Sequence, residues 1–186
     1  MTSPAIQQVP GYVAGAWNID PVHSEVAFTV RHMMVAKVRG RFTKFEGQLR
    51  TAENILDSSV EVTIDMTSID THNEQRDNHI RSGDFFEVTK YPTMSYRSLR
   101  LRPYGDNYVV EGELTLHGVT RPVELALELN GFTKDPFGGT RAGFTATAEI
   151  NRRDFGITID MPMDGGGAVV GDKVQISLEV ESVLQQ

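Results

Sequence analysis

The first side chains in the sequence that could do chemistry are Asp20, His23 and Ser24, which have the residue types of a nucleophilic triad. Working triads are assembled from separated segments, whereas these three residues share one short stretch without a nucleophile elbow around Ser24. We interpret them as polar caps of a turn that leads into a strand. The stretch from Gly166 to Lys173 nearly matches a phosphate-binding loop, but Asp172 stands where the lysine should be and would repel phosphate.

The five histidines, His23, His32, His72, His79 and His117, form no zinc-binding motif. His72 and His79 would lie about 10 Å apart along a helix, which is too far to share one metal ion. A site built from His23, His32 and His117 would require tertiary contacts that the sequence does not reveal. Since cysteine is also absent, we predict no catalytic residue, no metal site and no cofactor.

The composition is that of a soluble globular protein, and the 186 residues fit one domain. Acidic residues outnumber basic ones by 25 to 18, giving a net charge of −7. This charge disfavours nucleic-acid binding and also disfavours docking on an anionic membrane, unless a local basic patch compensates. No segment is apolar and long enough to span a membrane, and the first residues lack a signal peptide. We expect a cytoplasmic protein with a flexible tail over residues 1–15 and one domain over 16–186.

Most of the chain alternates apolar and polar residues with period two, which is the pattern of half-buried strands. Short turns at Gly105–Asn107 and His117–Thr120, and a longer loop at Lys134–Gly139, would join neighbouring antiparallel strands. A meander of about eight strands removes its exposed edges by closing into a barrel. Less regular strands are expected at 17–20, 25–31, 41–50 and 94–102.

The inward rows of this barrel would be apolar, and we expect them to line a tunnel. The predicted lining residues are Phe28, Val30, Phe45, Val62, Ile64, Leu114, Leu116, Leu125, Leu127, Phe144, Ile176 and Leu178. Small residues such as Gly47, Gly112 and Ala146 lie in the same rows, where they would make room for a ligand or serve barrel curvature.

One segment departs from the strand pattern. Thr71 and Glu74 have the spacing of a capping box, and Gly83 could end a helix, so the sequence predicts a helix at about residues 73–82 that covers one end or flank of the barrel. The glycine-rich segment 161–171 could be a mobile lid or a plain connection.

Basic residues cluster at Arg31, Lys37, Arg39, Arg41 and Lys44. Such a cluster could meet an anionic head group or could be a solvated rim. Our candidates for head-group contacts are Arg31, Arg39, Arg41 and Arg121. The arginines at positions 76, 81, 152 and 153 admit the same two interpretations.

Several long motifs resemble those of the YceI-like family. They are Trp17–Asp20 followed by Pro21–Ser24 and Phe28–His32, the run Arg76–Phe86 continued by Tyr91–Thr93, the run Gly112–Val123, and the shorter Arg153–Gly156 and Val170–Val174. The resemblance covers roughly residues 16–183, and the motifs stand in the family's order. Two departures are Ile80, where leucine is usual, and the three consecutive glycines from Gly165.

The resemblance implies an all-β fold, namely an extended eight-stranded antiparallel lipocalin-like β-barrel with one short helix. It also implies binding of a polyisoprenoid or a related long-chain amphiphile, such as a quinone or a fatty amide, and suggests a homodimer. Storage or transport of such a lipid is the leading functional hypothesis. The alternatives are an enzyme of isoprenoid or lipid metabolism that uses the same cavity, and a stress-associated structural or interaction protein with a closed core.

Overall fold

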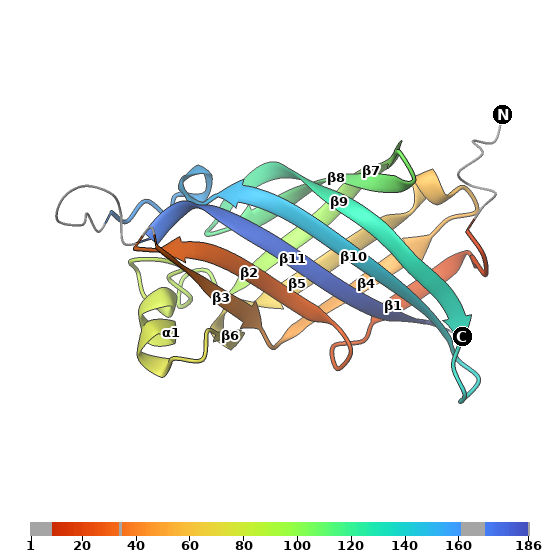
Figure 1. Ribbon diagram of the computed structural model, residues 1–186, viewed down its shortest axis with the longest axis horizontal. Helices are drawn as coiled ribbons and strands as arrows, with labels where there is room; N and C mark the ends of the chain where they lie inside the picture. Colours follow the sequence, from red (N-terminus) through yellow and green to blue (C-terminus); the bar gives the residue numbers. More distant parts are fainter. Residues whose placement is uncertain (1–8, 34, 161–169, 186) are drawn as a thin grey trace.

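The fold is an all-β antiparallel barrel with one α-helix at one end, as seen in a computed structural model that describes residues 9–33, 35–160 and 170–185 (Figure 1). The strands are β1 (Gly15–Ile19), β2 (Glu25–His32), β3 (Ala36–Phe42), β4 (Phe45–Thr51), β5 (Ser59–Asp65), β6 (Ile69–Asp70), β7 (Thr93–Tyr104), β8 (Asn107–Leu116), β9 (Val119–Lys134), β10 (Thr140–Asn151) and β11 (Val170–Leu184). The helix α1 is Glu74–Arg81, and short 3₁₀ turns lie at Ile55–Asp57 (η2), Met66–Ser68 (η3) and Arg152–Phe155 (η4).

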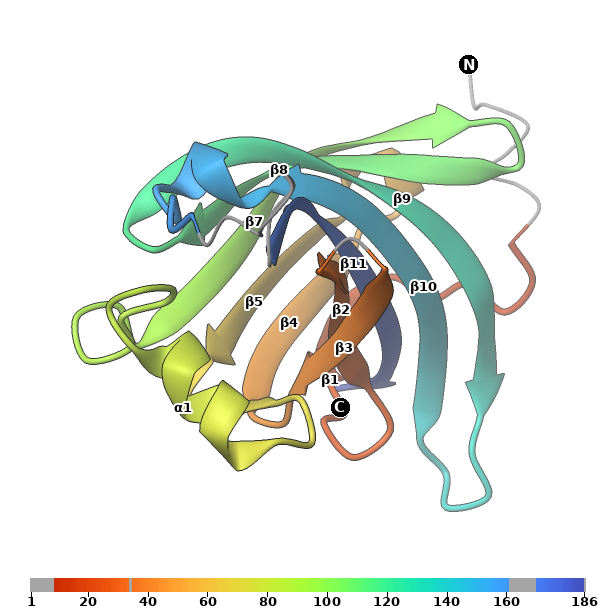
Figure 2. The same cartoon turned by 60° about the vertical axis from the view of Figure 1, so that its left-hand side comes forward.

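These eleven strands form an eight-stranded barrel, because three of the eight barrel strands are each interrupted and so divided in two. β11 pairs with β1 through its carboxyl-terminal end, where Trp17 is opposite Leu184, and with β2 through the rest of its length. In the same way, β1 pairs with β4 and β2 pairs with β3. On their other edges, β4 pairs with β5 and β3 pairs with β6. The circuit continues through β7, β8, β9 and β10 back to β11, which closes the barrel (Figure 2). The predicted eight-stranded barrel is therefore confirmed.

The interruptions lie next to one another in the sheet. The second interruption, at Thr43, is joined to the third by a hydrogen bond of 3.2 Å from the Thr43 amide to the Ser68 carbonyl. In the first interruption Pro21 removes a backbone donor, and in the third the Asp65 carboxylate caps a 3₁₀ turn by accepting from the Thr67 amide. The expected strand at 41–50 spans the second interruption, and β3 was not predicted as a separate strand.

The hairpins follow the turn chemistry of the sequence. His117 and Gly118 both have positive φ, 56° and 74°, which is the backbone of the tight turn that suits a two-residue hairpin. In the longer β9–β10 loop, one Asp135 carboxylate oxygen accepts from the amides of Phe137 and Gly139. Both connections were predicted, because turn residues report local geometry.

The helix lies where it was predicted, but its caps differ from the prediction. Asn73 is the N-cap, since its side chain accepts from the Arg76 amide at 2.9 Å, and Ser82 is the C-cap. Thr71 lies too early to cap this helix and instead donates to the Asp77 carboxylate, while Gly83 lies beyond the end. The capping-box spacing matched, but a competing Asn sits closer to the first turn.

Part of the expected N-terminal tail packs against the barrel. Val9 and Tyr12 contact the core, and Gly15 begins β1. Of the glycine-rich segment 161–171, only Val170 and Gly171 are described and they belong to β11, so the question of a lid lies outside the described residues.

Candidate functional site

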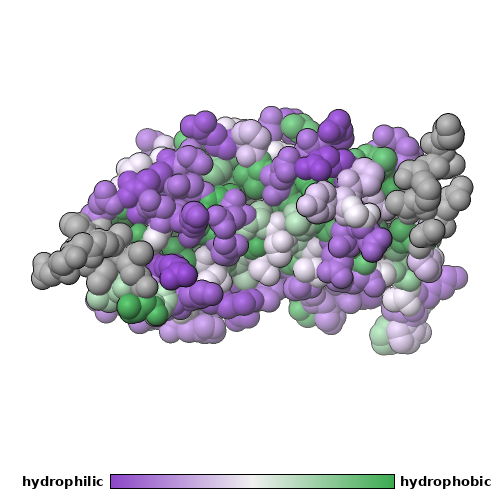
Figure 3. Space-filling view, turned by 45° about the horizontal axis from the view of Figure 1, so that its top comes forward, coloured by the Kyte–Doolittle hydropathy of each residue, from purple (hydrophilic) through white to green (hydrophobic). Residues whose placement is uncertain are grey.

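The barrel is hollow. A cavity of about 360 Å³ runs along its interior and is lined almost entirely by apolar side chains. Several inward side chains, including Val30, Val62, Leu127 and Ile176, are only half-buried although they face the inside of the sheet. A well-packed interior leaves few voids larger than a water molecule, so this residual exposure indicates empty space rather than a solid core. The outer face seen in Figure 3 is predominantly hydrophilic.

All twelve residues predicted to line the tunnel lie on the wall of this cavity. They are Phe28, Val30, Phe45, Val62, Ile64, Leu114, Leu116, Leu125, Leu127, Phe144, Ile176 and Leu178. The agreement has a simple cause, because side chains alternate between the two faces of a strand and one face of each strand must point inward.

Aromatic side chains fill the end of the barrel near the N-terminus. Phe132 makes edge contacts with Tyr12, Trp17 and Phe144, at ring-centroid distances of 5.2, 5.7 and 6.2 Å. The Trp17 indole donates to the Thr51 hydroxyl at 2.8 Å, and the Tyr12 hydroxyl donates to the Ala52 carbonyl. These contacts fix the aromatic rings, and Tyr12 and Phe132 thereby form the floor of the cavity.

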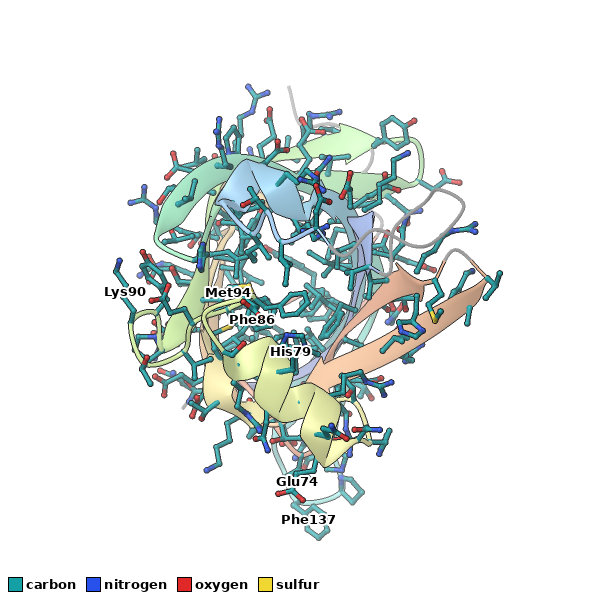
Figure 4. All side chains as sticks on the ribbon, turned by 90° about the vertical axis from the view of Figure 1, so that its left-hand side faces the viewer. Glu74, His79, Phe86, Lys90, Met94 and Phe137 are labelled. Carbon is teal, nitrogen blue, oxygen red and sulfur yellow. The ribbon has the colours of Figure 1, made fainter. Side chains whose placement is uncertain are left out.

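The segment from α1 to β7 forms part of the other end, which we call the mouth. Ile80, Phe85 and Phe86 line the cavity there together with Met94, the second residue of β7. Figure 4 looks into the barrel from this side, with His79 of α1 and Phe86 lying in front of the interior. As predicted, the helix covers one end of the barrel, and Ile80, Phe85 and Phe86 pack against the core there.

Basic side chains gather at the mouth. Arg31, His32, Arg76, His79 and Arg152 all contribute to the lining there, from β2, α1 and η4. Among the described residues, no aspartate or glutamate lines the cavity. The cavity of this acidic protein therefore has an apolar body and a basic mouth.

Two of these arginines are held by backbone carbonyls. Arg76 donates to the Thr71 hydroxyl and carbonyl at 2.8 and 2.6 Å, while the buried Asp77 accepts from the Thr71 amide at 3.0 Å. Arg152 is buried and donates to the Ile157 and Gly171 carbonyls at 2.8 and 3.0 Å, with Asp172 at 3.2 Å. Burial lowers the pKa of the Arg152 guanidinium, with the neighbouring Arg153 acting in the same direction. The Arg152 bonds fasten η4 to β11, and the Arg76 bonds fasten α1 to the segment that follows β6.

Of the four arginines proposed for head-group contacts, only Arg31 lines the cavity. Arg39 and Arg41 point outward and pair with Glu25 and Asp70 at 3.5 and 3.6 Å. Arg121 donates to the Asp154 carbonyl on the outside of the barrel. Lys37, Arg39 and Arg41 are alternate residues of β3 and therefore share its outward face, whereas Val38 and Phe42 of the same strand line the cavity.

The inward glycines make room for neighbouring side chains. A Cβ on Gly112 would collide with the Tyr96 hydroxyl, and one on Gly47 would lie 2.6 Å from Ile19. Tyr96 itself is buried, donates to the Val123 carbonyl at 2.8 Å, and has a pKa raised by burial. The idea that Gly47 and Gly112 make room for a ligand is therefore wrong, whereas Ala146 does line the cavity.

Asp20, His23 and Ser24, which the sequence indicates to be polar caps of a turn, belong to a structural cluster. The Ser24 hydroxyl donates to the Glu181 carbonyl and accepts from the Glu181 amide, so it is fully engaged. His23 lies 2.7 Å from Asp20, and Arg141 donates to Asp20 and Glu181 at 3.0 and 2.9 Å. Within the described part of the chain this is the one group with the spacing of metal ligands, and Arg141 already supplies the positive charge between its carboxylates.

None of the described helices is both long enough and apolar enough to cross a bilayer.

Comparison with known proteins agrees with this geometry. A family model described as YceI-like domain matches residues 17–182. A UPF0312 protein of Pseudomonas aeruginosa is 38% identical over 164 residues, covering 88% of this chain and 83% of that protein. The crystal structure of the Campylobacter jejuni YceI protein superimposes with a TM-score of 0.73 at 26% identity, covering 84% of this chain and 90% of the other. A polyisoprenoid binding domain from Saccharophagus degradans has the same fold, with a TM-score of 0.70 at 16% identity over 91% of this chain and 98% of that domain.

Proposed function

The chain belongs to the YceI-like family, and from the shape and chemistry of its cavity we propose that it binds a long-chain, isoprenoid-like amphiphile and holds the tail inside the barrel. The hollow apolar interior carries this proposal. The description of the Saccharophagus domain as polyisoprenoid-binding supports it as well, on a shared fold. Storage or transport of such a lipid, in the cytoplasm and by a homodimer, completes the proposal.

The tail supplies the affinity. Burial of each methylene-like group stabilises a complex by about 0.8 kcal/mol, less the cost of ordering the tail. A cavity of about 150 Å³ holds one benzene molecule, so by proportion the 360 Å³ here would take on the order of 15 carbon atoms, or three isoprene units. A longer tail would extend through the mouth or displace side chains.

The head group belongs at the mouth in this proposal. Arg31 would face a polar or anionic group that projects from the cavity, and no carboxylate of the described lining would oppose it. Arg39, Arg41 and Arg121 are less suited to this role because their donors are engaged on the outer face.

The two alternatives find less support. An enzyme acting in the cavity would need two titratable groups that converge on a substrate. The titratable side chains of the described lining are arginines, two histidines near the mouth, and tyrosines that are committed to hydrogen bonds. A structural protein with a closed core would have its barrel filled by its own side chains, whereas this barrel contains a cavity.

Calorimetric titration with prenol, geraniol, farnesol and geranylgeraniol tests the proposal. We expect each added unit up to farnesol to strengthen binding by at least about tenfold, and geranylgeraniol to add little. Affinity that does not change with tail length would contradict it. For the head group, Arg31→Glu should weaken binding of farnesyl diphosphate more than of farnesol, and the matched outward variant Arg39→Glu should affect neither.

A further inference from the structure

The hairpin formed by β2 and β3 carries an exposed apolar tip. Met33 and Val35 in its turn are 42% and 89% exposed, although both side chains are apolar. β2 and β3 run together to the same end of the molecule as α1 (Figure 1), so this tip stands at the mouth of the cavity. The hairpin also contributes to the cavity wall, through Val30, Arg31, His32 and Val38.

Positive charge lies on the two strands behind the tip. Residues 26–45 contain five lysines and arginines and no acidic residue, in a chain whose net charge is −7. Arg31 and Lys37 face each other across the hairpin, in the second residue pair below the turn. Arg39 and Arg41, two and four residue pairs further from the turn, are paired with Glu25 and Asp70, so the uncompensated charge of the hairpin is concentrated near the tip.

Apolar side chains at a tip, with cations directly behind them, match the layered chemistry of an anionic lipid surface. The apolar residues can enter the interface between head groups and acyl chains, while lysine and arginine reach the phosphates. The net negative charge of the whole molecule would then orient it with the hairpin toward the membrane.

We propose that the β2–β3 hairpin docks the barrel, mouth first, on an anionic phospholipid surface. The proposal goes beyond cavity binding and holds whatever molecule fills the cavity. Docking in this orientation would place the mouth against the lipids, where an amphiphile could pass between bilayer and barrel without crossing water. A second copy of the chain is a poorer occupant, because a two-fold contact through this hairpin would bring the same cations together.

Co-sedimentation of the full chain with vesicles of phosphatidylglycerol and phosphatidylcholine in equal parts tests the proposal, with pure phosphatidylcholine vesicles as reference. Each lysine or arginine near an anionic surface contributes about fivefold to partitioning. We therefore expect binding to the anionic vesicles at low salt, little to the neutral ones, and a steep loss as salt is added. Lys37→Glu should reduce binding at least about fivefold, and Val35→Asp by about tenfold.

Phe137 provides the matched control, since it is 94% exposed at the tip of the β9–β10 hairpin, away from the α1 end in Figure 1. Phe137→Asp should leave vesicle binding unchanged. Equal loss from Phe137→Asp and Val35→Asp, or salt-insensitive binding to both vesicle types, would overturn the proposal, as would dimers that Val35→Asp dissociates. Farnesol titration of Lys37→Glu and Val35→Asp tests cavity binding separately from membrane docking. Neither altered residue lines the cavity, so both variants should bind farnesol as the unaltered protein does.

Discussion

Gly112 illustrates how single residues shape the interior. It lies on the inward face of β8, opposite Ser98 of β7, and the ring of Tyr96 occupies the space where its side chain would be. Tyr96 in turn bonds to the Val123 carbonyl, which ties β7 to β9 across β8. The glycine is thus required by the packing of a neighbour, which depends on strand register.

Gly112→Ala should therefore destabilise the protein. The added methyl would meet the Tyr96 hydroxyl and lie 2.7 Å from the Arg97 carbonyl, and backbone atoms cannot move aside cheaply. We expect a loss of about 1–3 kcal/mol in the free energy of unfolding, measured by urea denaturation. Gly83→Ala is the control, because nothing lies within 4 Å of the new methyl, and an equal loss in both variants would contradict the packing argument.

The residue scale also shows where sequence reasoning stops. The twelve lining residues could be predicted, because alternation along a strand determines which side chains share a face. The basic mouth could not, since Arg31, Arg76 and Arg152 come from segments far apart in the chain and meet only through tertiary structure. The role of Gly112 was missed for the same reason.

At the scale of elements, the eight-stranded barrel was predictable, whereas the interruptions within three of its strands were not. Alternation and turn residues report local geometry, which is why β8, β9, β10 and their hairpins match expectation. The break between β1 and β2 depends on a polar cluster that joins Asp20 and His23 to Arg141 of β10 and Glu181 of β11. Such long-range contacts leave no periodic signal.

This cluster makes the stability of the break depend on pH. The pKa of Asp20 is lowered to about 2, chiefly by the hydrogen bond from His23 and also by Arg141, against a burial effect that raises it. Because the folded-state pKa lies below the unfolded value, the stabilisation is complete above that unfolded value of 3.8 and is lost as pH falls toward 2. For a partly exposed carboxylate we expect it to amount to about 1–2 kcal/mol.

Asp20→Asn should accordingly be less stable than the unaltered protein at about pH 5 and approach it at about pH 2, as measured by urea unfolding across that range. The control is Asp106→Asn, in the turn between β7 and β8, which should follow the unaltered protein throughout. If the gap between Asp20→Asn and the unaltered protein stayed constant with pH, the carboxylate would not be linked to folding through its charge.

For the whole molecule, a hollow barrel implies a compromise between stability and capacity. An interior of this size forgoes the contacts that a packed core would make, and filling a cavity commonly stabilises a protein. The same empty space is what a tail would occupy in the proposed function. Stability and binding should therefore change in opposite directions when the cavity alone is altered.

Ala146→Leu tests this opposition. Ala146 lines the cavity from β10, and its replacement by leucine adds three carbon atoms on the inward face. We expect the free energy of unfolding to rise by about 1–2 kcal/mol while farnesol binding falls at least about tenfold. Ala126→Leu is the matched control: Ala126 is exposed on β9, next to Leu127, which pairs with Ala146, so the same substitution adds its carbons outside. Should Ala146→Leu gain stability and keep its affinity, the tail would have to bind elsewhere, and the hollow interior would have to be explained without a ligand.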